Sequence, residues 1–119
     1  YRRFRQLRDV ERELQLYHQR KVFSGSPELT YQMLNADRPL EHSRHSVDGQ
    51  RERLKLVEDR IPGITVAVNQ TRVRGVGFRH LVDAAALLWT ARRIAGRVLS
   101  RMPVDPEWNE AGLRMEFVR

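Results

Sequence analysis

The sequence contains no cysteine, which excludes disulfide bonds and thiolate metal sites and fits a cytoplasmic protein. Long apolar runs are also missing: no stretch approaches the roughly 18 residues that a membrane-spanning helix needs, and no signal-peptide pattern is present. With 119 residues, the chain is one domain or part of one. Because it starts at Tyr1 within a charged helical pattern, we expect it to be a piece of a longer chain.

Positive charge is what the chain has in excess. The formal net charge is +7, from 22 lysines and arginines against 15 acidic residues, and this balance favours a polyanionic partner such as nucleic acid. The basic residues are spread through segments of mixed charge rather than gathered in one run. A solvated surface of mixed charge therefore stays open as the alternative.

The strongest structural signal is a helix over residues 80–95. This run is rich in alanine and leucine, and its apolar residues repeat at helical spacing. Its first turns are apolar nearly all round, which is typical of a helix buried on several sides. Asp83 interrupts this surface, and a buried carboxylate must be capped, paired or bound to a metal. Two roles stay open for Asp83: complementing the positive end of the helix, or acting as a functional carboxylate.

The rest of the chain alternates helical segments with polar connections. Ser26, Pro27 and Glu28 are residue types that start a helix, and capping alone can explain Glu28. In the first half we expect an amphipathic helix over 1–19 docked on a core, a short strand at 21–23, a helix over 27–35 and a loop over 37–45. A helix capped by Ser46 and ending near 59 follows, and then a strand or irregular segment at 64–68. After the helix over 80–95 we expect a connection over 102–109 and a half-buried strand over 113–118, in which Leu113, Met115 and Phe117 share one face. So few strands cannot form an independent sheet, so we expect the missing strands upstream.

The chemistry that the residues leave available is that of carboxylates. None of the four histidines lies in an HExxH pattern, and no serine lies in a nucleophile elbow. Glu28 and Asp83 remain, on separate elements of a basic chain. Carboxylates that share hard divalent cations can activate water for phosphodiester cleavage. The spacing of these two acids in the sequence does not show whether they meet.

Four segments, in this order, resemble a family catalogued as domain of unknown function 429, which is regarded as a group of ribonuclease-H-like nucleases. Pro27-Glu28, with Leu29 and Tyr31, is similar to the family's Glu-x-His-Pro-Glu segment. Ser43 to Gly49, followed by Arg51 and Arg53, is similar to the family's basic Ser-Lys-Lys-Thr-x-x-Gly-Arg stretch. Val82 to Ala86, with Trp89 to Arg93, is similar to its Leu-Asp-Ala helix. Gly112 to Glu116 is similar to its closing strand.

The resemblance implies an α/β, ribonuclease-H-like fold, of which residues 1–119 are a helix-rich C-terminal part with few strands. It implies a metal-dependent nuclease acting on nucleic acid, with Asp83 as the late-helix acid that holds Mg²⁺ or Mn²⁺ and Glu28 as a second catalytic acid. Arg44, His45, Arg51 and Arg53 occupy the family's basic stretch and are candidates for phosphate contacts. A solvated basic surface is the other interpretation of these four residues.

Two further hypotheses belong to other classes of protein. Ser24 and Ser26 stand where the family segment has Glu and His, and together with the net charge this favours a non-catalytic nucleic-acid-binding module on the same scaffold. Such a module predicts metal-independent binding that weakens steeply with salt. The other hypothesis is a helical interaction domain that folds with a partner and has no nucleic-acid role.

Overall fold

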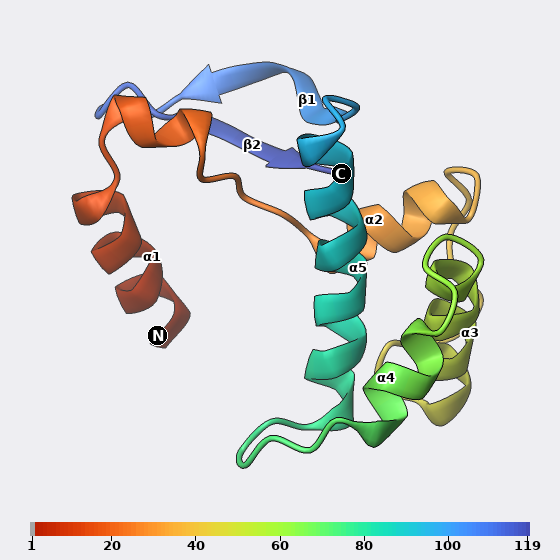
Figure 1. The fold of residues 1–119 in the computed structure, drawn as a ribbon. Helices are drawn as coiled ribbons and strands as arrows, with labels where there is room; N and C mark the ends of the chain where they lie inside the picture. The colour runs from red at the N-terminus through yellow and green to blue at the C-terminus, as the bar shows by residue number, and fades with distance from the viewer. Residues whose placement is uncertain (1) are drawn as a thin grey trace.

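The computed structural model describes residues 2–119, and the side chains of residues 4–119. Its elements, in order, are α1 (Arg2–Glu13), the 3₁₀ helix η1 (Leu16–Arg20), α2 (Pro27–Leu34), α3 (Val47–Glu58), α4 (Ile64–Gln70), α5 (Phe78–Ala95), β1 (Arg101–Trp108) and β2 (Arg114–Val118). Figure 1 shows α2, α3 and α4 on one side of α5, with the two strands near its C-terminal end. A helix-rich chain with few strands is thus confirmed, while the ribonuclease-H-like arrangement stays a prediction.

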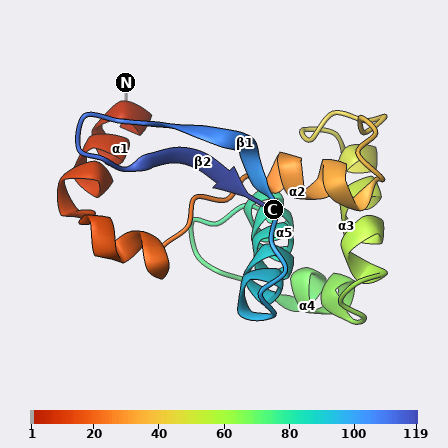
Figure 2. The same cartoon turned by 90° about the horizontal axis from the view of Figure 1, so that it is seen from above.

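Helix α5 is the centre of the core, as its composition predicts. Its buried residues Val82, Ala85 and Ala86 recur at helical spacing and pack with residues of α2, α3 and α4. The view from above shows these three helices along one side of α5 (Figure 2). The expectation of burial on several sides was wrong for the described residues, because Leu87 and Leu88 on the other side of α5 are exposed.

In residues 2–119, no helix combines the length and apolar character that crossing a bilayer requires.

A buried pair of hydroxyl groups joins α2 to α5. The Oγ1 atoms of Thr30 and Thr90 lie 2.7 Å apart, and both residues are fully enclosed. We expect Thr30→Val and Thr90→Val each to lower the free energy of unfolding by about 1 kcal/mol, because each leaves one buried hydroxyl without its partner. Urea unfolding of the single and double variants measures this. The double variant should lose less than the sum of the singles, and strict additivity would show that the two hydroxyls are not coupled.

Segment 64–68 forms part of a helix, so the expectation of a strand or an irregular segment was wrong. Local β-branched character favoured a strand, but Val68 is buried in the shared core, and that packing decides the outcome. The carboxylate of Glu58 accepts hydrogen bonds from the N–H groups of Gly63 and Thr65, at 2.7 and 2.9 Å, and these bonds satisfy the start of α4. They also lower the pKa of Glu58.

Residues 101–108 form strand β1, so the prediction of a connection over 102–109 was wrong. β1 pairs with β2 in antiparallel register, Arg101 opposite Val118 and Trp108 opposite Arg114. The register shifts between Met102 and Glu107, and the two prolines of this strand, Pro103 and Pro106, lie in that stretch. Proline has no N–H for the ladder, so an irregular stretch of this kind is where a strand tolerates it.

Strand β2 confirms the expected strand over 113–118, but the face that it buries is different. Leu113, just before the strand, is buried as predicted, but Met115 and Phe117 are exposed, whereas Val118 is buried. Val118 is buried because the segment at residues 24–25 of the same chain lies beside it. The Val118 N–H donates to the Ser24 carbonyl at 2.8 Å, and Gly25 pairs with Val118 in a parallel bridge. That bridge is the only strand pairing near the expected strand at 21–23 within residues 2–119.

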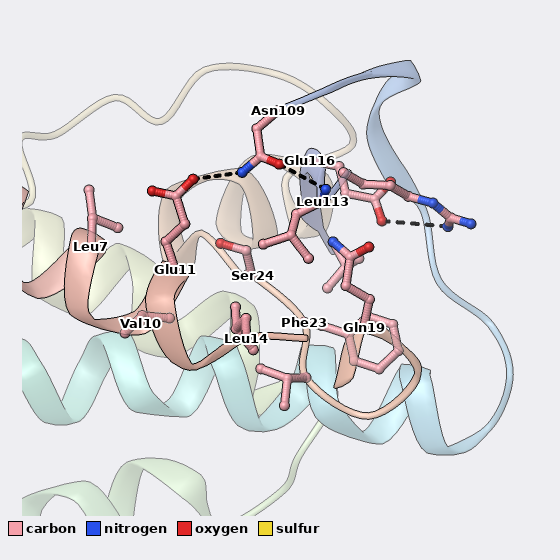
Figure 3. A pocket seen from close by; sticks show the side chains of 13 residues that line it. Leu7, Val10, Glu11, Leu14, Gln19, Phe23, Ser24, Asn109, Leu113 and Glu116 are labelled. Carbon is pink, nitrogen blue, oxygen red and sulfur yellow. Dashed lines mark hydrogen bonds and ion pairs between the residues drawn. The ribbon is translucent and has the colours of Figure 1, made fainter. Parts of the chain in front are cut away.

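Helix α1 is amphipathic but does not dock on the core, so that expectation was wrong. The helix ends at Glu13, and η1 follows in place of its predicted last turns. Leu7 and Val10 are more than half exposed, and they line a hollow of about 350 Å³ between α1 and the strands. Figure 3 shows the polar contact that closes one side of this hollow, from Asn109 Nδ2 to Glu11 Oε1, at 2.7 Å.

Candidate functional site

The first part of the candidate site is an ion pair between α2 and α3. Arg53 Nε and Nη2 donate to the two oxygens of Glu28, at 3.0 and 2.7 Å. Arg53 Nη1 donates to the carbonyl oxygens of His42 and Gly49, at 3.1 and 2.9 Å. The Arg53 side chain is only 4% exposed, and its hydrogen bonds to Glu28 raise its pKa. Arg53 therefore ties together α2, α3 and the loop that precedes α3.

Tyr31 lies between this ion pair and α5. The Arg53 guanidinium stacks over the Tyr31 ring, 5.9 Å from its centroid, and the Tyr31 hydroxyl donates to the Val82 carbonyl at 2.6 Å. Burial raises the pKa of Tyr31 strongly, the negative charges of Asp83 and Glu28 add to that rise, and Arg53 opposes it. Arg53 links Glu28 to the Tyr31 ring, and the Val82 carbonyl that the phenol binds belongs to the residue before Asp83. The structure brings Glu28 and Asp83 into one region, although their spacing in the sequence did not show that they meet.

Asp83 forms the second ion pair of the site, with Arg44. Arg44 Nη2 donates to Asp83 Oδ2 at 2.8 Å, and the two side chains are 36% and 17% exposed. Because α5 begins at Phe78, Asp83 lies beyond the first helical turn, which contains no acidic residue. Of the three ways to satisfy a carboxylate on a buried helix, the structure therefore shows pairing with a cation.

Two basic side chains, His45 and Arg79, meet where α3 and α5 begin. Arg44 precedes His45 in the loop and pairs with Asp83, one turn after Arg79 on α5, and we name Arg44, His45 and Arg79 the loop–helix basic cluster. Arg79 Nη1 lies 2.7 Å from His45 Nδ1. In residues 4–119, no carboxylate forms an ion pair with Arg79 or His45. The Nε–H groups of Arg44 and Arg79 are buried and have no hydrogen-bond acceptor among the described residues. The cluster thus has donor capacity that the described part of the chain leaves unused.

The four predicted phosphate-binding residues have different environments. Arg44 and His45 belong to the basic cluster, whereas Arg51 is an exposed residue of α3 whose Nη1 is 3.4 Å from Asp48. Arg53 faces the interior and binds Glu28. Sequence reasoning missed Arg79, because 34 residues separate it from His45 and no motif joins them. The roles of these residues toward nucleic acid stay predictions.

The side chains of this region do not by themselves fit a Mg²⁺ or Mn²⁺ site. Such ions take several oxygen ligands at once, yet no group of three or more metal-binding side chains occurs among the described residues. The two candidate acids are each held by an arginine, Glu28 by Arg53 and Asp83 by Arg44. A metal would therefore need ligands beyond these two, and it would compete with both ion pairs.

Comparison with known proteins gives one match, to a protein family. The family is described as "Protein of unknown function (DUF429)", and the match spans residues 1–107. The chain belongs to the DUF429 family. The match runs from α1 into β1 and includes the whole candidate site, whereas the closing-strand segment at Gly112 to Glu116 lies outside it. Searches of curated proteins and of solved structures gave no match. The family description assigns no activity, so a function for this DUF429 chain must be argued from its geometry.

Proposed function

We propose that this DUF429 chain binds nucleic acid through its phosphates, at the loop–helix basic cluster. The observation that carries the proposal is the close approach of two basic side chains, with 2.7 Å between Arg79 Nη1 and His45 Nδ1, while no carboxylate among the described residues pairs with either. Phosphate oxygens are strong acceptors for guanidinium donors, and phosphate contacts provide most of the non-specific affinity of nucleic-acid-binding proteins.

The electrostatic setting supports the same proposal. Gly77 is the N-cap residue of helix α5, so no side chain caps the N–H groups at the start of this helix. The first turn of α5 also contains no acidic residue. The positive end of a helix favours a bound anion. The net charge of +7 adds a long-range attraction toward a polyanion. Asp83 neutralises Arg44 in part but also holds its guanidinium at the cluster.

The test is fluorescence anisotropy with short DNA and RNA oligonucleotides over a range of salt concentrations. Affinity should fall steeply as salt rises. Arg79→Ala should weaken binding about tenfold, the loss of a charge-assisted hydrogen bond, and should reduce the log–log salt slope by about one. Arg92→Ala, an equal change of charge at an exposed position of α5, is the matched control. A flat salt response, or an equal loss in both variants, would contradict phosphate binding at the cluster.

Metal-dependent phosphodiester cleavage, which the resemblance implies, is a second candidate. One observation favours it: Arg53, which binds Glu28, lies over the Tyr31 ring, and the Tyr31 hydroxyl donates to the carbonyl of Val82, the residue before Asp83. Mg²⁺ or Mn²⁺ would need further ligands from outside the described residues. Thermal melting with millimolar Mn²⁺ separates the two candidates, because an ion that binds the folded state raises Tm. A rise that disappears in Asp83→Asn would favour the nuclease, and no rise would leave phosphate binding alone.

A further inference from the structure

A groove between α3 and α4 lies beside the basic cluster. It has a volume of about 480 Å³, and its lining includes side chains of α3, α4 and the first residue of α5. Phe78 and Val47 both line the groove. Phe78 directly precedes Arg79 in the chain, and Val47 directly follows the loop that carries His45. The groove therefore continues the surface on which phosphate binding is proposed.

The lining combines three kinds of chemistry. Val47 and Phe78 provide apolar surface, and Gln50 and Asn69 provide amide groups. Asn69 Nδ2 donates to the Thr65 carbonyl at 2.9 Å, which holds that amide in place on α4. A flat ring with polar edges needs this combination of apolar contact and hydrogen-bonding groups.

Charge at the groove has one sign. Arg51 and Lys55 lie one turn apart on α3, both are exposed, and no carboxylate belongs to the lining. The only partner of Arg51 among the described residues is Asp48, at 3.4 Å, and both side chains of that pair are well exposed. Exposed pairs of this kind are weak. The guanidinium of Arg51 is therefore able to turn to an incoming anion.

We propose that this groove is a nucleotide subsite. The base lies on Val47 and Phe78, the amides of Gln50 and Asn69 meet its polar edge, and Arg51 and Lys55 bind its phosphate. Aromatic stacking is a sequence-tolerant way to hold a base, and basic side chains follow the backbone beside it. This inference rests on the proposed function and deepens it, because the subsite gives the phosphate-binding surface a means of holding an unpaired base.

The test is titration of the whole chain with adenosine 5′-monophosphate, followed by NMR or calorimetry, beside inorganic phosphate. Lys55→Ala should weaken the binding of the nucleotide severalfold, because it removes one of the two phosphate-binding charges. Lys21→Ala is the matched control, since Lys21 is the other lysine of the chain and lies outside the groove. Phe78→Leu should weaken binding about tenfold by removing the stacking surface, and a melting curve checks that this variant folds.

The results separate this subsite from the proposed function. Inorganic phosphate that binds as tightly as the nucleotide, or a nucleotide affinity unchanged in both Lys55→Ala and Phe78→Leu, would overturn the subsite. Loss of oligonucleotide binding in Arg79→Ala with no binding of the mononucleotide would also overturn it, while leaving the proposed function intact. Displacement of the nucleotide by polyglutamate at equal charge would assign the groove to acidic peptides instead. Nucleotide binding without oligonucleotide binding would support the subsite and refute the proposed function.

Discussion

Replacing Arg53 with methionine should lower the free energy of unfolding by about 3 kcal/mol, the low end of the range for breaking a buried ion pair by removing one partner. Arg53 is 4% exposed and makes four hydrogen bonds, two to Glu28 and one each to the carbonyls of His42 and Gly49. Methionine fills much of the same space but leaves these acceptors without a donor. The Glu28 side chain is 37% exposed, so water can hydrate part of the carboxylate, and this places the loss at the low end.

Chemical denaturation of Arg53→Met beside Arg51→Met measures this loss. Arg51 lies two residues away on the exposed side of α3, so its replacement should change stability by less than about 0.5 kcal/mol. Arg53→Lys should not restore wild-type stability, because a single ammonium group cannot reproduce the planar pattern of donors. Equal stability of wild type and Arg53→Met would show that the ion pair does not hold α2 to α3.

Gly49→Ala should lower the free energy of unfolding by about 2 kcal/mol, within the range for overpacking, although alanine is normally the better helix residue. A Cβ atom at position 49 would come within 1.9 Å of the Ser43 carbonyl oxygen, which is a backbone atom and has little freedom to move. That carbonyl also accepts the Ser46 hydroxyl at 2.8 Å, and Ser46 Oγ accepts the Gly49 N–H at 2.9 Å. The substitution must therefore push away the loop that caps α3.

The same loop carries Arg44 and His45, so Gly49→Ala should also weaken oligonucleotide binding if the basic cluster is the binding site. Gly96→Ala is the matched control, because Gly96 lies at the opposite end of α5 and a Cβ there meets only the carbonyl oxygens of Arg92 and Arg93, at 3.4 and 3.6 Å. Its stability should stay within about 0.5 kcal/mol of wild type. Thermal and urea unfolding of both variants give the comparison, and a stable Gly49→Ala would refute the close approach of this loop to α3.

Three of the four core helices, α2, α3 and α5, could be predicted from the sequence because their signals are local. The periodicity of residues 80–95 predicted α5, and the structure adds only two residues at its start. Ser46 caps α3 as predicted, through its bond to the Gly49 N–H. Pro27 begins α2 as predicted, although the Ser26 side chain makes no capping hydrogen bond. Caps and helical faces depend on residues within one or two turns, so a single stretch of sequence is enough to predict them.

The candidate site was predictable only in part. The sequence identified Asp83 and Glu28 as the acids to follow, but it could not predict that Arg44 and Arg53 neutralise them, since the partners are 39 and 25 residues away. Arg79 carried no signal, because its importance depends on the position of His45 in another loop. Choice of an ion-pair partner is a tertiary property, set by which helices pack together and which side chains they bury.

The sequence by itself determined the positive charge, the absence of cysteine, the family resemblance, and the helices α2, α3 and α5 to within two residues at their ends. Only the tertiary structure decided that residues 64–70 form a helix and residues 101–108 a strand, because buried Val68 and the pairing of β1 with β2 override local preference. The tertiary structure also decided that Arg53 is buried against Glu28 and that the buried Nε–H groups of Arg44 and Arg79 have no acceptor among the described residues. The physical reason is the same throughout: burial and pairing join residues that are distant in sequence, and no local pattern encodes them.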